Sequence, residues 1–501
     1  MVLAGRLPTR MILFFVLVFA ALAWASTLVS LPWSDEGWFA GPALNLITKG
    51  TFGTPVLDPT ASFRTNNLTG ITQHTYWIVP LYPLAEAAWY KVVGFGLLKL
   101  RVLSIFWGLL ALGAWWKIVE ILTADRRAAT VALGILSIDF TVVWSSSVGR
   151  MDIMAAALGG CGLAAYLMLR EGPLWRAVLV SQTLIAAAGM SHPMAVGYWA
   201  GLLFLTLYLD RKRIRLSHVA IACVPYLIGA AAWGLYIAQD FPSFLLQFGG
   251  NAADRGLHLN DPMSIIRAQI YTRYLGMFGM AADTTGLSHL KILILAAYAA
   301  GVAGALIEPR IRRDPGRRML LLLAVSILVP MMVIDREAQQ IYLIHFVVWL
   351  ASITAMTATW WWDTRPGWRW MLVACAVIVV FVQISTTAKR IQRAAYAKEY
   401  LPVAAYLKQH APGHGFVFGS TEFAFELGFH GPLVDDSRLG FRSGKRPDFI
   451  VLDKNRYQEW IPQYETREPA TYRYIRDMID HQFHFVMDTG AYKLYARNGL
   501  E

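Results

Sequence analysis

The sequence predicts a mainly α-helical, polytopic membrane protein with a small soluble α/β domain at its C-terminal end. Of the 501 residues, 56% are hydrophobic and 16% are charged, and the mean hydropathy is +0.44. This composition is too apolar for an ordinary soluble chain. After residue 398 the long apolar runs stop and short alternating segments follow, which is the pattern of a soluble domain.

The first apolar run covers residues 11–31. Arg6 and Arg10 before it, and the small residues around Ala23 and Ala25, resemble a secretory signal peptide with its cleavage site. The run has about the ~20 residues that a spanning helix needs, which is long for the core of a signal peptide. We therefore expect a first membrane helix that is retained.

Further apolar runs long enough to span a membrane alternate with clusters of basic residues. The runs are residues 103–122, 129–147, 153–169, 219–238, 290–307, 319–334, 341–361 and 370–387. The clusters are Arg6/Arg10, Arg126/Arg127, Arg170/Arg176, Arg211/Lys212/Arg213/Arg215, Arg310/Arg312/Arg313/Arg317/Arg318 and Arg365/Arg369. The positive-inside rule places all of these clusters on the cytoplasmic side.

Because all basic clusters lie on the cytoplasmic side, the chain between two consecutive clusters must cross the membrane an even number of times. Residues 75–98 are apolar, but a crossing there would put three spans between Arg10 and Arg126, so we expect a helix on the outer surface. Residues 175–209 must cross twice, and their break at "GMSHPM" makes His192 part of an outer turn. Eleven spans follow, with the N-terminus inside and the residues after 398 outside.

The expected organisation is a transmembrane domain of residues 1–397 and an outer domain of residues 398–501. The long outer loops are residues 32–100 and 239–289, and short outer turns are expected at 145–152, 191–193 and 335–340. In the C-terminal domain, "FVFGS", "DFIVLD", "FHFVMD" and "AYKLYAR" predict strands, and "YLPVAAYLKQH" and "TYRYIRDMIDHQ" predict helices.

Charge and cysteine content exclude other classes. Basic residues exceed acidic ones, 45 against 33, but their place between apolar runs reflects membrane orientation rather than nucleic-acid binding. Cys161, Cys223 and Cys375 all lie inside apolar runs. They indicate neither a disulfide framework nor a thiolate metal site.

Asp35 and Glu36 open the first outer loop, directly after the first span. Acidic residues in the first turn of a helix interact favourably with its dipole, so both residues fit a helix start. Two carboxylates at the membrane boundary also fit the acid/base groups of an enzyme. The two interpretations are compatible.

Arg150 and Asp152 lie in the outer turn before the fourth span, on the same side as Asp35. They fit a local ion pair at a helix end, or an arginine that holds a phosphate beside an acid that orients a hydroxyl. Other polar residues expected on this side are Arg64, His74, Arg101, His192, Tyr342 and His345. Each alone is more typical of an interfacial or satisfied polar residue than of a ligand.

Two further polar features have a structural explanation. His74 and His192 could make a metal site together with an acid, but no ligand spacing supports one, so the sequence leaves a divalent metal open without indicating it. Asp139 lies in the middle of a span, and we expect it to contact a polar group of another helix.

The order of motifs resembles that of the GT-C membrane glycosyltransferases. These motifs are "SDEGWFAGPALNLITKGTFGTP", "HTYWIVPLYPLAEAAWYKVVGFGLLKLRVLSIFWG" and "VWSSSVGRMDIMAAALG", followed later by "QQIYLIHFVVWLASI". The similarity is greatest to bacterial relatives of protein O-mannosyltransferases and of lipid A aminoarabinose transferases. It is good over roughly the first 200 residues. Where relatives have Lys-Pro-Pro or His-Pro-Pro this chain has "QHTYW", and where many have Thr-Lys-Gly-Pro it has "MSHPM", which puts His192 in the place of a lysine.

The resemblance implies transfer of a hexose or pentose from a polyprenyl monophosphate to a lipid, glycan or protein of the cell envelope, with inversion. It implies Asp35 as general base, with Glu36 as the fallback, and Asp152 as the group that orients the acceptor or an arginine. The phosphate would be stabilised by Arg150, Arg64 and His74, and the donor groove lined by Tyr342 and His345. Arg101 and His192 are also expected to bind the donor. The implied place is the inner (plasma) membrane, with chemistry on the outer face.

A transporter or lipid flippase is the alternative function. Transporters usually place ionisable residues and broken helices at the middle of the membrane, often in paired repeats. This sequence instead concentrates ionisable residues at one boundary and has no visible repeat. A structural or sensory membrane protein is a third class, in which Asp35 would be dispensable.

Overall fold

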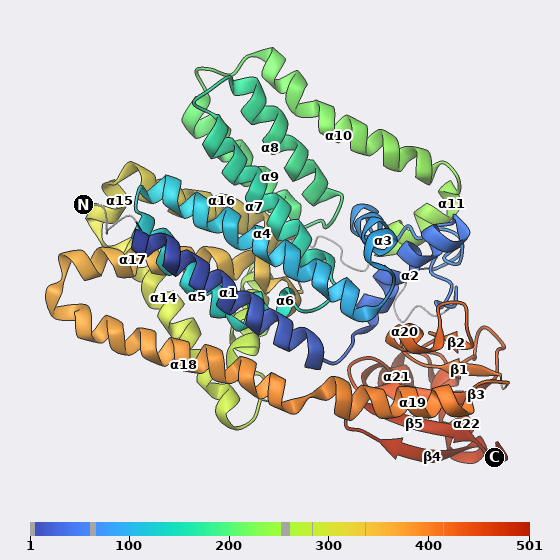
Figure 1. Ribbon diagram of the computed structural model, residues 1–501. Helices are drawn as coiled ribbons and strands as arrows, with labels where there is room; N and C mark the ends of the chain where they lie inside the picture. Colours follow the sequence, from blue (N-terminus) through green and yellow to red (C-terminus); the bar gives the residue numbers. More distant parts are fainter. Residues whose placement is uncertain are drawn as a thin grey trace.

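The computed structural model describes residues 6–60, 67–251, 261–282, 284–335, 337–413 and 415–500. A bundle of long helices lies beside a small sheet that contains the C-terminus (Figure 1). The start of α1 (Arg6–Val29) and the basic helix α15 (Pro309–Arg313) lie at the end of the bundle opposite to the sheet. The chain is therefore a multi-span membrane protein with a small α/β unit, as the sequence predicts.

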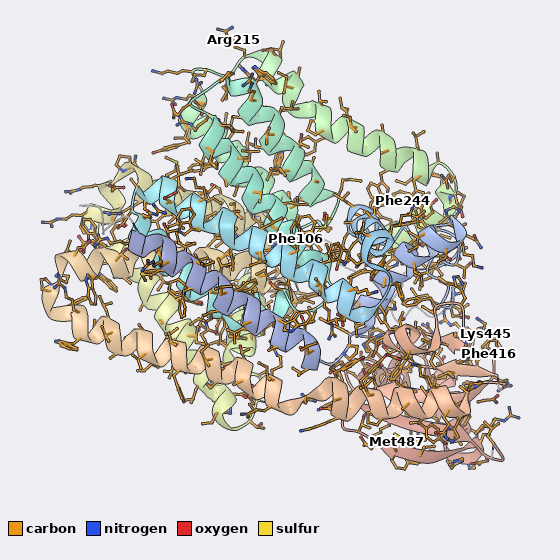
Figure 2. All side chains as sticks on the ribbon, viewed as in Figure 1. Phe106, Arg215, Phe244, Phe416, Lys445 and Met487 are labelled. Atoms are coloured by element: carbon orange, nitrogen blue, oxygen red, sulfur yellow. The ribbon has the colours of Figure 1, made fainter. Side chains whose placement is uncertain are left out.

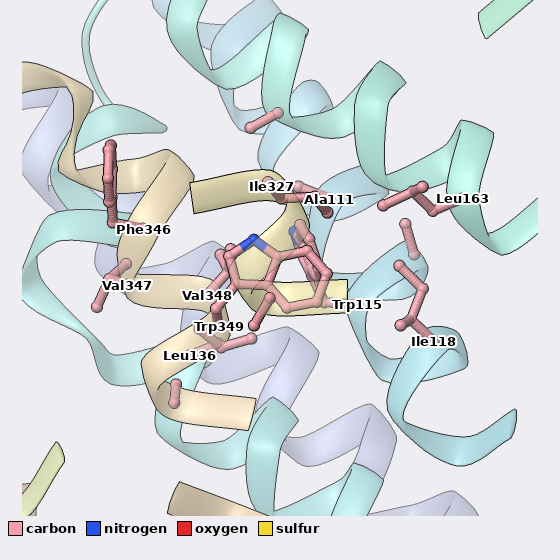
Figure 3. Packing of buried hydrophobic residues seen from close by; sticks show 14 of the residues in the cluster. Ala111, Trp115, Ile118, Leu136, Leu163, Ile327, Phe346, Val347, Val348 and Trp349 are labelled. Atoms are coloured by element: carbon pink, nitrogen blue, oxygen red, sulfur yellow. The ribbon is translucent and has the colours of Figure 1, made fainter. Parts of the chain in front are cut away.

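Eight helical segments in the described part of the chain are long and apolar enough to cross a membrane. Their main helices are α1 (Arg6–Val29), α4 (Leu97–Thr123), α7 (Met151–Leu169), α10 (Leu216–Ile237), α14 (Ile292–Ile307), α16 (Pro315–Ile334), α17 (Ile344–Thr364) and α18 (Arg369–Arg393). Each of them coincides with a predicted span. Figure 3 shows the packing between them, where the rings of Trp115 and Trp349 meet edge to face at 4.5 Å.

The three other predicted spans fall on shorter helices. Two of them are α8 (Leu174–Gly189) and α9 (Ala195–Asp210), which are separated by the predicted turn at His192. The third is divided into α5 (Arg126–Ile138) and α6 (Phe140–Ser145), with Asp139 at the break. The total of eleven crossings and the orientation remain predictions.

Asp139 is buried and fully engaged, as expected for a polar residue within a span. Its carboxylate caps α6 by accepting from the amides of Thr141 and Val142. It also accepts from the Tyr298 hydroxyl at 2.7 Å and from the Gln383 amide at 2.9 Å. The break in the helix is therefore held by hydrogen bonds from two other helices.

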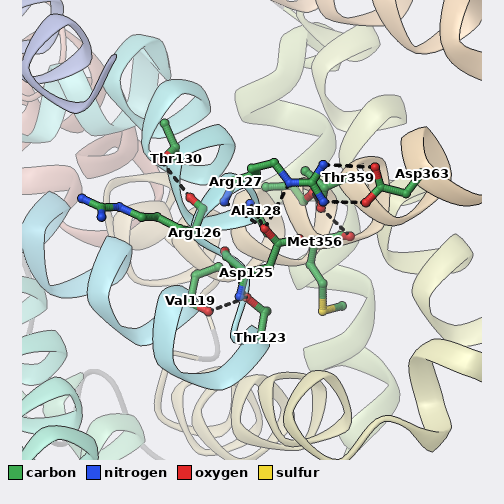
Figure 4. A network of polar contacts seen from close by, with 11 residues as sticks. Val119, Thr123, Asp125, Arg126, Arg127, Ala128, Thr130, Met356, Thr359 and Asp363 are labelled. Carbon is green, nitrogen blue, oxygen red and sulfur yellow. Dashed lines mark hydrogen bonds and ion pairs between the residues drawn. The ribbon is translucent and has the colours of Figure 1, made fainter. Parts of the chain in front are cut away.

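A polar network closes the turn between α4 and α5, at one of the basic clusters (Figure 4). Asp125 caps α5 by accepting from the amides of Arg127 and Ala128 at 2.9 and 3.3 Å. The Arg127 guanidinium binds both oxygens of Asp363, at 3.1 and 2.6 Å. The network joins the start of α5 to the end of α17.

The segment between α1 and α4, which the sequence predicts to be the first outer loop, contains α2 (Ser34–Lys49) and α3 (Leu81–Val93). Gly50 ends α2 in a left-handed conformation, with φ of 76°, and its amide donates to the Leu46 carbonyl. The 13 residues of α3 measure about 20 Å, short of the ~30 Å of a hydrocarbon core. The apolar segment 75–98 therefore supplies a short helix that is packed on α2 and α4.

Short helical turns connect the remaining segments. They are α11 (Phe241–Phe244), η1 (Leu245–Gly249), α13 (Pro262–Ala268), η2 (Gln269–Met280), η3 (Gly286–Lys291), η4 (Gln340–Leu343), η5 (Pro366–Trp368) and η6 (Tyr396–Tyr400).

The C-terminal sheet has five strands in the order β2-β1-β3-β5-β4. The strands are β1 (Phe416–Phe418), β2 (Leu433–Val434), β3 (Pro447–Asp453), β4 (Phe483–Asp488) and β5 (Tyr492–Arg497). β1 pairs in parallel with β2 and β3, and β5 pairs antiparallel with β3 and β4. The helical elements are α19 (Leu401–His410), η7 (Thr421–Phe423), α20 (Ala424–Leu427), α21 (Tyr457–Arg467) and α22 (Pro469–Gln482).

The C-terminal unit is joined to the first outer loop. Buried residues of both, such as Phe39, Tyr82, Tyr400 and Phe449, belong to one hydrophobic cluster. Lys445, labelled with Phe416 in Figure 2, donates to Asp58 of the loop at 2.7 Å. The sheet is thus fixed against α2, the helix whose first turn contains Asp35.

Candidate active site

Asp35 and Glu36 occupy the first turn of α2, as the helix-start interpretation predicts. Consecutive residues of a helix point about 100° apart, so the two carboxylates meet different partners. The side chain of Glu36 is fully buried, whereas that of Asp35 is 17% exposed. Asp35 is therefore the more accessible of the two carboxylates.

Glu36 is satisfied on both oxygens. Oε1 accepts from Arg101 Nε and from the Gly149 amide, both at 2.7 Å. Oε2 accepts from Arg101 Nη2 at 2.7 Å and from the Trp33 amide at 3.0 Å. These four bonds tie the start of α2 to α4 and to the turn before α7.

Arg101 is equally satisfied, because a guanidinium has five N–H donors. Two bind Glu36, and the other three bind the carbonyls of Thr27, Ser30 and Leu31 at the end of α1. Glu36 and Arg101 therefore form a structural ion pair. This differs from the sequence expectation that Glu36 is a fallback base and Arg101 a substrate ligand.

Asp35 belongs to a second chain of charges. Its carboxylate contacts the guanidinium of Arg150, and Arg150 Nε donates to Asp152 Oδ2 at 2.9 Å. The guanidinium carbon of Arg150 lies 4.8 Å from the ring centroid of Trp33. Arg150 and Asp152 are buried, so Asp35 is the most accessible of the three.

Two histidines from different turns continue this chain. His192 Nε2 lies 3.6 Å from Asp152 Oδ1, and the His192 ring lies 4.9 Å from that of Tyr342 and 5.9 Å from that of His345. The structure thus assembles six predicted residues: Asp35, Arg150, Asp152, His192, Tyr342 and His345. Their convergence follows the prediction that these turns lie on one side.

His74 lies at a different place, beside an apolar cavity of about 650 Å³. The cavity lies between the end of α2, the start of α3, α8 and α10, and its lining includes Leu81, Ala187 and Ile228. α10, which borders one side of the cavity, has no buried residue. Arg64, the other expected phosphate ligand of the first loop, lies outside the described residues.

His74 stands at the polar rim of this cavity. Its ring stacks on Tyr76 at 5.4 Å, and its Nδ1 is buried with no hydrogen-bond partner. Met190 also lines the cavity and stands two residues before His192. The cavity and the Asp35 cluster therefore both border the turn between α8 and α9.

The sequence did not indicate Arg273, a fully buried arginine in η2. It contacts the Asp335 carboxylate, donates to Gln269 Oε1 at 2.6 Å, and lies 4.0 Å from the ring centroid of Phe346. Phe346 follows His345, so Arg273 adds a cation near the cluster. An arginine in a long outer loop has no sequence pattern that predicts burial.

A second residue that the sequence missed, Asp435, fixes the C-terminal unit against α2. The buried carboxylate accepts from both terminal nitrogens of Arg456 at 3.0 and 2.9 Å, and from the Trp38 indole at 3.0 Å. Burial raises the pKa of Asp435, but Arg456 outweighs it and holds that pKa below its usual value. Trp38 lies one helical turn after Asp35, so this contact supports the predicted catalytic helix.

The same interface contains a buried carboxyl group whose pKa is raised. Burial, followed by the charge of Asp453, raises the pKa of Glu422 from 4.5 to about 8. Glu422 Oε1 accepts from the Tyr492 hydroxyl at 3.0 Å. A neutral Glu422 avoids the cost of a buried charge.

Two groups of solved structures share this fold. ArnT from Cupriavidus metallidurans bound to undecaprenyl phosphate matches 98% of this chain and 99% of its own, with a TM-score of 0.58 and 14% identity. The archaeal oligosaccharyltransferase AglB from Archaeoglobus fulgidus, in complex with an inhibitory peptide and a dolichol-phosphate, matches 97% of this chain and 74% of its own, with a TM-score of 0.53 and 13% identity. The sequence matches no protein-family profile and no curated protein. The expected GT-C fold is therefore confirmed.

Proposed function

We propose that this protein is an integral membrane glycosyltransferase that moves a sugar from a polyprenyl-phosphate donor to an acceptor of the cell envelope, with inversion. The observation that carries the proposal is the accessible Asp35 carboxylate, which is paired with Arg150 at the head of α2. The fold shared with ArnT and AglB supports it. The proposed site is the outer face of the inner membrane, where the turns of this cluster are predicted to lie.

Asp35 is the proposed general base. As the acceptor hydroxyl attacks the anomeric carbon, its proton passes to the carboxylate and the bond to the polyprenyl phosphate breaks. Arg150 holds Asp35 in place and is itself held by Asp152. A positioned base of this kind contributes ~10²- to 10⁴-fold to the rate.

The lipid tail of the donor is assigned to the apolar cavity beside α10. An isoprenoid chain fits its apolar lining, and the cavity is bordered by an exposed transmembrane helix, which gives a lipid direct access. His74, which lines the cavity, is the group assigned to the phosphate, as the sequence predicts, and Tyr342 and His345 are assigned to the donor groove. Arg273 is a further cation for the phosphate charge.

The transporter alternative has one feature in its favour, the broken helix α5–α6 at Asp139. Transporters use such breaks to bind a substrate at the middle of the membrane. Here Tyr298, Gln383 and two backbone amides satisfy the Asp139 carboxylate. The break is thus closed to a substrate, and the accessible acid lies at the boundary instead.

The test uses the purified full-length protein in liposomes with labelled undecaprenyl-phosphate sugars and an envelope extract as acceptor source. A transferase releases free undecaprenyl phosphate and moves the label to a new product. A flippase moves intact labelled donor between leaflets without releasing undecaprenyl phosphate. Lipid movement without release would overturn the proposal.

A further inference from the structure

Asp152, His192 and His345 are all residue types that bind metal ions, and they meet behind the Asp35–Arg150 pair. Each offers one donor atom, and the three atoms lie within 4.8 Å of one another. All three residues are buried. Among the residues that the structure describes, this is the one group of three or more His, Cys, Asp and Glu side chains with such spacing.

Two of the donor atoms have no hydrogen bond to the protein. Asp152 Oδ1 and His345 Nε2 are buried without a hydrogen-bond partner, although buried polar atoms nearly always have one. The opposite side of each ligand is held: Arg150 Nε donates to Asp152 Oδ2 at 2.9 Å, and the Tyr198 hydroxyl lies 3.1 Å from His345 Nδ1. Such outer partners orient metal ligands and leave their other atoms for the ion.

We propose that Asp152, His192 and His345 bind one divalent transition-metal cation, with Zn²⁺ as the best match. Two imidazoles and one carboxylate form a ligand set that suits Zn²⁺. Donors at about 2.1 Å from a tetrahedral ion lie about 3.4 Å apart, close to the 3.6 Å between His192 Nε2 and Asp152 Oδ1. The three donor atoms lie within 4.8 Å of one another, so His345 must move in by at most about 1.4 Å, and the fourth position is left for water or substrate.

Binding requires a change of tautomer at His192. The Met194 amide donates to His192 Nδ1 at 3.1 Å, so the neutral ring carries its proton on Nε2. A cation bound at Nε2 displaces this proton to Nδ1. The hydrogen bond from the Met194 amide to Nδ1 is then lost. Two buried N–H donors then face each other without an acceptor, which weakens affinity by about ten- to a hundredfold and leaves a buried three-ligand site in the range of useful affinity.

The cation would bind the oxygen of Asp152 that Arg150 does not use. Asp152 would then be fixed on both sides, and through Arg150 so would Asp35. The proposal stands on the three side chains alone and does not depend on the transferase activity.

The experiment measures metal content. The full-length protein in detergent is stripped with a chelator, loaded with excess Zn²⁺, passed over a desalting column and analysed by mass spectrometry for zinc. We expect one Zn²⁺ per chain in the wild type and in the control variant His481→Gln, whose histidine is exposed on α22. We expect less than a tenth of that in the double variant His192→Gln/His345→Gln.

The zinc content of the wild-type protein is the decisive measurement, because a variant can lose its metal by misfolding. Wild-type zinc below about a tenth of an equivalent overturns the proposal, as does equal zinc in the wild type and in a monodisperse double variant. Loading with Co²⁺ gives a second readout on the wild type, because cobalt with these ligands absorbs visible light. Absence of that absorption also overturns it.

Discussion

Replacement of Glu36 with alanine tests whether this carboxylate is structural rather than catalytic. The change leaves the Arg101 guanidinium buried without its counter-charge, together with the Gly149 and Trp33 amides that Glu36 accepts from. Removal of one partner from a buried ion pair costs about 3–5 kcal/mol. For a chain of this length that corresponds to a decrease in Tm of roughly 3–5 °C.

The assay is the thermal unfolding of the detergent-solubilised protein, followed by tryptophan fluorescence. Glu120→Ala is the matched control, because Glu120 pairs with Lys117 at 2.7 Å on the surface, where such a pair contributes about 0.5 kcal/mol or less. A double variant Glu36→Leu/Arg101→Leu should be more stable than Glu36→Ala, since it leaves no unpaired charge. An unchanged Tm of Glu36→Ala together with lost sugar transfer would refute the reasoning and make Glu36 catalytic.

Two further predictions concern the contact between α2 and the C-terminal unit. A Cβ on Gly37 would lie 2.6 Å from Thr421 Cγ2 and 2.7 Å from the Thr421 carbonyl oxygen, so Gly37→Ala should lower stability by about 1–3 kcal/mol. In the same unfolding assay Gly113→Ala, which meets nothing within 4 Å, should be neutral or stabilising; equal values for the two would contradict the close packing. Since the pKa of Glu422 is about 8 when folded and near 4.5 when unfolded, the folded state holds an extra proton between these values, and stability should fall as pH rises from 4.5 to 8. Glu422→Gln should reduce this dependence, measured as Tm at pH 5.5 and 8, and a dependence identical to that of the wild type would contradict the assignment.

The sequence predicted the membrane spans because long apolar runs and basic loops are local features. Because the basic loops share one side of the membrane, the sequence also predicted that Asp35, Arg150, Asp152 and His192 lie together on the other side. The structure joins these four residues in one cluster. Four of the five strands were also predicted. β2, with two residues, is too short to carry a periodic pattern.

What the sequence could not show depends on contacts between distant segments. Glu36 follows Asp35 directly, and only the direction of each side chain on α2 separates the satisfied acid from the accessible one. Arg273 and Asp435 lie far along the chain from their neighbours in space, and nothing local predicts that they are buried. His74 and His192 were considered together as metal ligands, whereas the structure places His192 with Asp152 and His345.

The most direct test of the central claim compares sugar transfer and lipid binding in Asp35→Asn. The turnover of labelled undecaprenyl-phosphate sugar should fall by ~10²- to 10⁴-fold, because the variant lacks the base. The affinity for undecaprenyl phosphate should stay within about threefold, because the lipid is assigned to a cavity that Asp35 does not line. Asp477→Asn, an exposed aspartate of α22, serves as the control and should turn over like the wild type. Full turnover of a folded Asp35→Asn protein would contradict the account.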